Sequence, residues 1–127
     1  METDFTIAQI ILSVKKMNNL VHFYRDVIGL PILYPNGFTD YSTESWVEFN
    51  TGSCKLCLHS GGTMNMGKDA PRFTFTVKNV NETRKKFLEK GVTMTEIRIV
   101  GPGNKVCDGR DPEGNTFSFE QFISGNY

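Results

Sequence analysis

The chain has 127 residues, of which 39% are hydrophobic, 12 are glycine and 3 are cysteine, and 14 basic residues balance 14 acidic ones to a formal net charge of +0. This composition is typical of one domain with a single core, and the neutral charge provides no basic field to attract nucleic acid. Because the sequence has neither a signal-peptide pattern nor a run of roughly 20 apolar residues, we expect a cytoplasmic protein with reduced cysteines and no membrane partner.

An internal repeat organises the sequence. The segment SVKKMNN at residues 13–19 is similar to TVKNVNE at residues 76–82, and such self-similarity indicates two related halves. A run in which apolar residues alternate with other residues leads into this segment in each half. It covers residues 5–14 in the first half and residues 72–77 in the second. Both runs are rich in β-branched and aromatic residues and are predicted to be strands.

A helical pattern follows each of these strands. In the first half the apolar residues at helical spacing are Leu20, Phe23, Tyr24, Val27 and Ile28. In the second half they are Val80, Thr83, Phe87 and Leu88. Asn79 with Glu82 resembles a capping box, and Gly29 and Gly91 suit the left-handed residue at a helix end. We therefore expect one helix in each half, with these ends.

Three more extended segments follow each helix. They cover residues 30–34, 41–50 and 53–60 in the first half, and residues 92–100, 104–110 and 116–122 in the second. Turn clusters such as PNG at 35–37 and DPEGN at 111–115 separate them. The sequence therefore predicts one domain over residues 1–127, built from two βαβββ units at about 5–60 and about 71–122 with a linker at about 61–70.

Three features together resemble the vicinal oxygen chelate superfamily, which includes glyoxalases, bleomycin-resistance proteins and extradiol dioxygenases. They are the tandem βαβββ units, the phrase FYRDVIGLP at residues 23–31, and the DPEGN turn before the last strand. The resemblance implies an α+β fold in which two curved mixed sheets surround a shared cup. It also implies a homodimer and a small-molecule ligand in that cup, but a fold alone does not determine a reaction.

The resemblance also assigns metal-ligand positions. In the metal-dependent members, four side chains on the first and last strands of the two units bind one divalent ion, and here those positions are Gln9, Cys57, Arg72 and Ser118. The set is poor, because metal sites use carboxylate, imidazole or thiolate groups, whereas a guanidinium stays charged and only donates hydrogen bonds. We therefore expect no metal cofactor, since the charge of Arg72 would repel the ion.

Strand alternation adds two residues to this face, because His59 follows Cys57 by two positions and Glu120 follows Ser118 by two. In the functional interpretation this polar cluster binds the polar end of a ligand, with Arg72 facing an anion and His59 or Glu120 moving protons as catalytic groups. In the alternative interpretation Arg72 and Glu120 pair with each other across the sheet, and His59 caps a strand end in solvent.

Cys54 and Cys57 form a Cys-x-x-Cys pattern within one predicted strand. Because side chains alternate along a strand, the two thiols should point to opposite faces. We therefore expect these two cysteines and Cys107 to be small, buried apolar side chains. A nucleophilic Cys57 with His59 as its base is the alternative.

Aromatic residues gather around the second and third predicted strands. Trp46, with its neighbours Tyr34, Phe38 and Tyr41, is predicted to form either one wall of a ligand pocket or part of the core. Glu44 and Glu48, which flank Trp46 at alternating positions, are expected on an exposed or rim face. In the second half the residues expected to pack beneath the helix are Phe73, Phe75, Phe117 and Phe119.

These observations favour a small-molecule-binding protein without the usual metal centre, either a binder like the drug-resistance proteins or a metal-independent enzyme. The alternative is a lyase, isomerase or dioxygenase that holds one divalent metal ion through ligands shifted to His59, Glu120 and Gln9. A regulatory or scaffolding domain with a packed cup is a third hypothesis.

Overall fold

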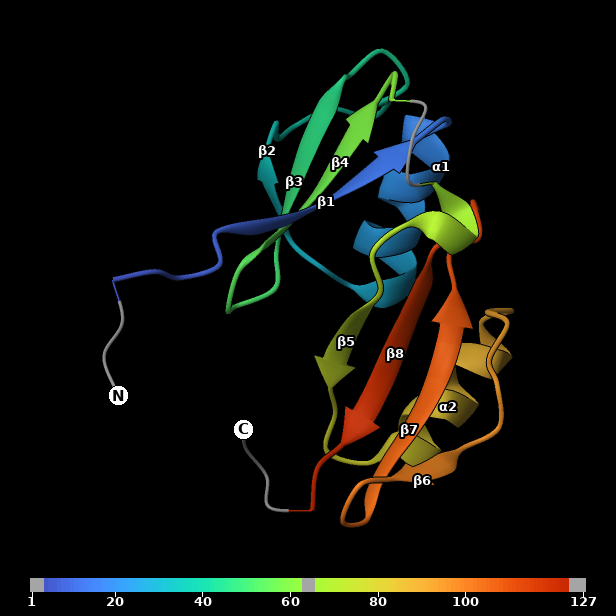
Figure 1. Ribbon diagram of the computed structural model, residues 1–127. Helices are drawn as coiled ribbons and strands as arrows, with labels where there is room; N and C mark the ends of the chain where they lie inside the picture. Colours follow the sequence, from blue (N-terminus) through green and yellow to red (C-terminus); the bar gives the residue numbers. More distant parts are fainter. Residues whose placement is uncertain (1–3, 63–65, 124–127) are drawn as a thin grey trace. The chain divides into compact units, whose positions relative to one another are not determined.

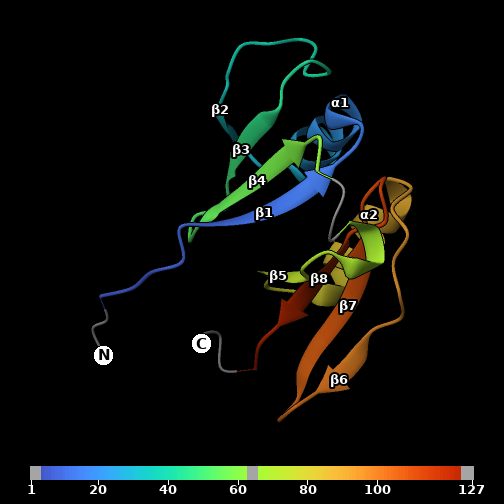
Figure 2. The same ribbon diagram turned by 45° about the horizontal axis from the view of Figure 1, so that its top comes forward.

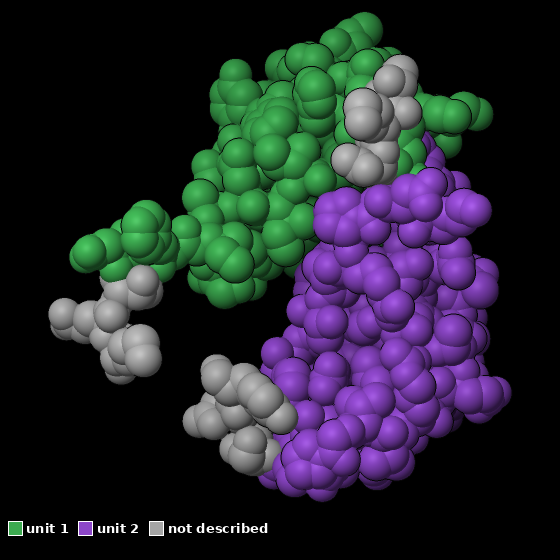
Figure 3. Space-filling model, viewed as in Figure 1, with its two compact units in different colours: residues 1–66 green, residues 67–127 purple. Residues whose placement is uncertain are grey.

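The computed structural model describes residues 4–62 and 66–123. The chain forms two compact units, unit 1 over Met1–Met66 and unit 2 over Gly67–Tyr127 (Figure 3). The boundary between them falls within the predicted linker. Residues 63–65 of that linker lie outside the described residues, and Gly67–Asp69 forms a turn of 3-10 helix.

Unit 1 consists of one four-stranded sheet and one helical segment (Figure 1). Its strands are β1 (Gln9–Val14), β2 (Ile32–Tyr34), β3 (Trp46–Asn50) and β4 (Lys55–Ser60), in the spatial order β1-β4-β3-β2. β1 is parallel to β4, and the other neighbours are antiparallel. The helical segment comprises α1 (Met17–Val21) and a π-helical turn at His22–Ile28. This is the predicted βαβββ order.

Alternation along the strands gives the sheet of unit 1 one core face. Leu12, Val47, Phe49 and Leu58 are buried on the side of the helical segment, where the ring of Tyr24 lies 6.1 Å from that of Phe49. The apolar side chains therefore pack between the sheet and the helical segment. Figure 2 shows α1 against one face of this sheet.

The end of the helical segment departs in part from the predicted stripe. Gly29 ends the segment in the left-handed conformation with a φ of 95°, as predicted. Val27 and Ile28 are only half-buried, whereas Leu20 and Tyr24 are fully buried.

Unit 2 repeats this architecture. Its elements are β5 (Phe73–Thr76), α2 (Val80–Glu89), β6 (Arg98–Val100), β7 (Asn104–Arg110) and β8 (Thr116–Gln121). The spatial order is β5-β8-β7-β6, with β5 parallel to β8 and the other neighbours antiparallel. The prediction of two tandem βαβββ units is confirmed.

Aromatic rings fill the space between this sheet and α2. Phe117 and Phe119 are buried, and Phe87 of α2 stacks on Phe119 with ring centroids 5.1 Å apart. Phe73 and Phe75 are half-buried and contact the ring of Phe117. The predicted core positions of Phe117 and Phe119 are confirmed, and Phe73 and Phe75 lie at the edge of the same aromatic cluster.

The ends of α2 agree with the sequence, although its apolar stripe is shorter than predicted. The side chain of Asn79 accepts a hydrogen bond from the backbone N–H of Glu82 at 3.1 Å, and Gly91 is left-handed with a φ of 84°. Leu88 is 42% exposed, so its predicted place in the stripe is wrong, whereas Phe87 is buried as predicted.

Most predicted strands are shorter in the structure, and the difference is largest for those predicted at residues 5–14, 41–50 and 92–100, because a strand needs a hydrogen-bonding partner. Residues 5–8 are exposed, since β1 begins where its partner β4 begins, at the pair Gln9 and Lys55. Residues 41–45 belong to a turn instead. The carboxylate of Asp40 accepts hydrogen bonds from the backbone N–H and the hydroxyl of Ser42 in this turn. Residues 92–97 make one isolated bridge to β7.

The DPEGN turn joins β7 to β8 through buried polar contacts. The carboxylate of Asp111 accepts from the backbone N–H groups of Glu113 and Asn115, each at 2.9 Å, and from the side-chain amide of Asn115 at 2.7 Å. Asp111 is 5% exposed and Asn115 is 0% exposed. This network fixes how β8 returns beside β7.

Within the described part of the chain, no helix combines the length and the apolar character that crossing a bilayer requires.

Candidate functional site

Each sheet has one face that its helix does not cover, which we call the helix-free face. In unit 2 this face carries Arg72, just before β5, and Ser118 and Glu120 of β8. Asp108 of β7 lies directly across from Ser118 in the antiparallel register, so both side chains point to the same side. The structure thus brings the three predicted residues of unit 2 to one face, together with Asp108.

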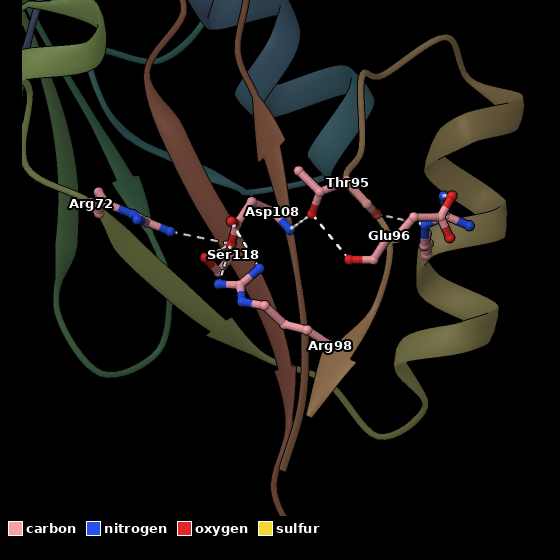
Figure 4. Close-up of polar contacts among 7 residues, drawn as sticks. Arg72, Thr95, Glu96, Arg98, Asp108 and Ser118 are labelled. Atoms are coloured by element: carbon pink, nitrogen blue, oxygen red, sulfur yellow. Dashed lines mark hydrogen bonds and ion pairs between the residues drawn. The ribbon is translucent and has the colours of Figure 1, made fainter. Parts of the chain in front are cut away.

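Asp108 is the centre of a polar network that we call the Asp108 cluster, made of Arg72, Arg98, Asp108 and Ser118 (Figure 4). The hydroxyl of Ser118 donates to Oδ1 at 2.6 Å, and Arg98 donates to Oδ2 at 3.0 Å and to Oδ1 at 3.3 Å. One terminal nitrogen of Arg72 lies 3.3 Å from Oδ1. The carboxylate side chain is 17% exposed and that of Arg72 is 59% exposed. The cluster contacts Arg72 at one point and leaves more than half of its side chain exposed.

The alternative pairing of Arg72 with Glu120 is wrong. In the parallel register Phe73 lies opposite Phe117 and Thr76 opposite Glu120, which places Arg72 beside Thr116. Glu120 is four residues further along β8, roughly 13 Å at the rise of a strand. Asp108 on β7 is within reach and takes the ion pair instead.

The environment of Asp108 keeps its carboxylate ionised. Partial burial raises the pKa of this group, but hydrogen bonds from Ser118 and Arg98 and the charges of Arg98 and Arg72 outweigh burial and lower the pKa below its ordinary value of 3.8. The bidentate contact with Arg98 is therefore an ion pair at neutral pH.

A carboxylate with a lowered pKa stabilises the fold at pH values above its unfolded pKa and loses that contribution as pH falls through the folded pKa. We expect Asp108→Asn to be less stable than the wild type at neutral pH, and the difference to shrink as pH falls below 3.8. Urea denaturation of both proteins at several pH values between neutral and strongly acidic measures this. A difference that stays constant over that range would contradict the role given to the ionised carboxylate.

In unit 1 the helix-free face carries the other four predicted residues. The thiol of Cys57 donates to Oε1 of Gln9 over 3.6 Å, and the rings of Trp46 and His59, paired across β3 and β4, have centroids 5.9 Å apart. Gln9, Trp46, Cys57 and His59 therefore share one face of the sheet, as the alternation of the strands predicts.

Glu48 belongs to this face as well, and it is half-buried rather than exposed. The indole Nε1 of Trp46 donates to Oε2 of Glu48 at 2.8 Å, and Nζ of Lys55 donates to Oε1 at 3.2 Å. The side chain of Glu48 is only 19% exposed. It lies two residues after Trp46 on the same strand, so alternation puts both side chains on the same side and the carboxylate fixes the indole.

Cys57 is held as a thiol. Burial raises its pKa, and the nearby carboxylate of Glu48 raises it further. Since the thiolate is the reactive form, these surroundings argue against the alternative of a Cys57 nucleophile. Cys57 and Cys107 are buried as expected, whereas Cys54 is half-buried.

His59 and Glu120, the predicted catalytic residues, lie in different units. His59 is exposed near the end of β4, which agrees with the solvent-facing alternative, and Glu120 is half-buried on β8. Their roles in proton transfer stay predictions.

The four positions that the resemblance assigns to metal ligands do not form a suitable donor set. In unit 2 the Ser118 hydroxyl is bonded to Asp108 and Arg72 offers only donors; in unit 1 the oxygen of Gln9 faces a protonated thiol. Within either unit, and among residues that the structure describes, no three His, Cys, Asp or Glu side chains lie close enough to hold a metal ion. The residues present do not fit the divalent ion of the metal-dependent relatives.

Sequence reasoning missed Asp108 and the role of Glu48. The available signal was a carboxylate in the interior of a predicted strand, since acidic residues are seldom enclosed there without partners. Asp108 stands between apolar neighbours in residues 104–110, and its partners lie on other strands.

Comparisons with known proteins agree with this architecture. A comparison with curated protein sequences finds no match. Among solved structures, lactoylglutathione lyase from Agrobacterium tumefaciens is similar, with a TM-score of 0.76 at 19% identity over 98% of this chain and 99% of that chain. TnmS3, an antibiotic binding protein from Streptomyces sp. CB03234, has a TM-score of 0.75 at 16% identity over 95% of this chain and 98% of that chain.

A third similar structure is a superfamily member from Sphaerobacter thermophilus DSM 20745, with a TM-score of 0.72 at 16% identity over 93% of this chain and 98% of that chain. At these identities the structures show a shared fold. The sequence profile that matches is more specific, because it covers residues 6–119, almost all of both βαβββ units. The chain belongs to the glyoxalase/bleomycin resistance protein/dioxygenase superfamily.

Proposed function

We propose that this protein binds a small molecule through an anionic group, and that Arg72 on the helix-free face of unit 2 is the main contact for that group. The observation that carries the proposal is the exposed side chain of Arg72, whose guanidinium is anchored by Asp108, at a position that the family resemblance assigns to a metal ligand. A fixed positive charge at that position suits an anion rather than a cation.

The electrostatics of the Asp108 cluster support this assignment. Asp108 is already neutralised by two contacts with Arg98, and it accepts a third hydrogen bond from Ser118. Within the described residues Arg72 makes one ion-pair contact, at 3.3 Å, while a guanidinium has five N–H donors. Arg72 therefore has donors available for a carboxylate or phosphate, and Asp108 keeps its side chain in place.

We also propose that this binding requires no metal ion, because the donor set at the equivalent positions does not suit one. The similar structures include one named as a lyase and one named as an antibiotic binding protein. A binding role without the chemistry of the metal-dependent relatives is therefore compatible with this fold.

The test is equilibrium dialysis of the purified protein against a deproteinised metabolite extract of its expression host, with EDTA present, followed by mass spectrometry of the retained compounds. We expect the wild type to retain at least one anionic compound and Arg72→Ala to retain about tenfold less or lower, since a charge-assisted hydrogen bond contributes about 1.5–3 kcal/mol. Arg72→Lys should retain an intermediate amount, because it keeps the charge without the planar fork.

Arg25→Ala is the matched control, because it also removes an arginine that is paired with one carboxylate, Asp26, but it lies on the helical segment of unit 1. It should retain the compound as the wild type does. Equal retention by wild type and Arg72→Ala would overturn the assignment of Arg72, and retention only in the absence of EDTA would overturn the metal-free proposal.

A further inference from the structure

Unit 2 contains a pocket of about 160 Å³ at one end of the helix-free face. The residues that matter for its chemistry are Arg72, Arg110, Thr93, Thr95, Thr116 and Asp108. Pockets for whole drug-sized ligands have volumes of about 300–1,000 Å³. This pocket therefore has the size for one small group of a larger ligand.

Two arginines of this pocket, Arg72 and Arg110, lie on either side of one threonine, Thr116. Arg110 of β7 is paired with Thr116 of β8 in the antiparallel register. On the other side of Thr116, the parallel pairing of Phe73 with Phe117 places Arg72 beside it. Because paired residues share a face, the side chains of Arg72 and Arg110 lie on the same side of the sheet as that of Thr116, and all three line the pocket.

The wall opposite this row is held close to β7. The backbone N–H of Thr95 donates to the carbonyl of Asp108 at 2.8 Å, and the hydroxyl of Thr95 accepts from the backbone N–H of Asp108 at 2.9 Å. Gly109 permits this approach, since a Cβ there would lie 2.9 Å from Sδ of Met94 and 2.6 Å from the buried ring of Phe117. The pocket wall is therefore hydrogen-bonded to the edge of β7, although it forms no strand of its own.

The charges lining this pocket leave an excess of positive charge. The Asp108 carboxylate is offset by Arg98, which contacts both of its oxygens. Arg110 is exposed, and no ion pair joins it to any acidic side chain in the described ranges 4–62 and 66–123. Arg72 and Arg110 together thus present two guanidinium charges with unused donors.

We propose that this pocket is an oxyanion subsite in which Arg72 and Arg110 bind a phosphate group of the ligand from two sides, with the Thr116 hydroxyl between them. Two guanidinium charges match a phosphate dianion better than a singly charged carboxylate, and arginine forks fit phosphate oxygens. This inference rests on the proposed function and makes it more specific, because it assigns Arg110 and Thr116 a role and names the class of the anionic group.

The probe is inorganic phosphate, titrated into ¹⁵N-labelled full-length protein at a constant ionic strength of about 0.15 M, so that general screening does not change. Acetate is titrated in parallel. We expect phosphate at millimolar concentrations to shift the backbone amide of Thr116 and the side-chain Nε–H signals of Arg72 and Arg110, and acetate to bind several-fold more weakly. Arg110→Gln should weaken phosphate binding about tenfold.

Lys78→Gln is the matched control, because it removes one exposed positive charge of unit 2 outside the pocket. It should bind phosphate as the wild type does. Unchanged signals in the wild type, or an equal loss in Arg110→Gln and Lys78→Gln, would overturn the subsite. Acetate binding as tightly as phosphate would overturn the phosphate assignment.

The two proposals fail in different ways. If Arg72→Ala loses the dialysed anion while Arg110→Gln keeps it and phosphate does not bind, the proposed function stands and this subsite is wrong. If Arg72→Ala retains the anion as the wild type does, the proposed function is wrong too.

Discussion

Phe117→Ala is expected to lower the free energy of unfolding by about 3–5 kcal/mol, the range for truncation of a buried aromatic residue. The side chain of Phe117 is 0% exposed, and its ring centroid lies 5.4 Å from that of Phe119, 6.1 Å from that of Phe75 and 6.4 Å from that of Phe73. Alanine would leave a cavity among these rings that the sheet, packed against α2, cannot fill. Urea denaturation followed by circular dichroism measures the change.

Ile99→Ala is the control for this prediction, because Ile99 is a large apolar residue of the same sheet that is 61% exposed on β6. Its replacement should change the free energy of unfolding by no more than about 0.5 kcal/mol. A similar cost for the two variants would show that the aromatic cluster is not the core of unit 2.

Asp111→Ala is expected to lower the free energy of unfolding by about 3 kcal/mol. The substitution removes a carboxylate that accepts charge-assisted hydrogen bonds, and it leaves the buried donors of those bonds without an acceptor. The donors are the backbone N–H groups of Glu113 and Asn115 and the side-chain amide of Asn115. Asn115 is fully buried, so water cannot take over its hydrogen bonds. Thermal and urea denaturation both measure the loss.

Asp40→Ala is the matched control, since the Asp40 carboxylate likewise accepts hydrogen bonds within its own turn, two of them from Ser42, but this turn is exposed. Water can hydrate the donors that Asp40 releases, so a clearly smaller loss is expected than for Asp111→Ala. If both variants lose equal stability, burial of the DPEGN turn is not what makes Asp111 important.

Elements whose two ends are marked by local chemistry were predictable from the sequence. The strand predicted at residues 104–110 has the same bounds as β7, because Gly101, Pro102 and Gly103 precede it and the DPEGN turn follows. α2 begins after the predicted cap at Asn79 for the same reason. Capping and turn formation depend on neighbouring residues, so the sequence carries their signal directly.

Strand ends without such a local marker were predicted too long. The apolar pattern of residues 5–8 continues that of β1, yet these residues have no strand beside them, because β4 begins only at Lys55. The residues predicted to share a face in each unit do share it, since alternation within a strand is also a local property.

The chain's own sequence thus determined the two βαβββ units, the faces of their strands and the presence of a fixed positive charge at Arg72. Only the tertiary structure decided which carboxylate that charge meets, because the registers of β5, β8 and β7 bring Asp108 within 3.3 Å of Arg72 and leave Glu120 out of reach. The same registers place Arg110 beside Thr116. The register of β7 with β8 follows from the short DPEGN turn that joins them. The pairing of β5 with β8 joins segments far apart in the chain, and its register depends on the packing of one whole face, so no local pattern in the sequence specifies it.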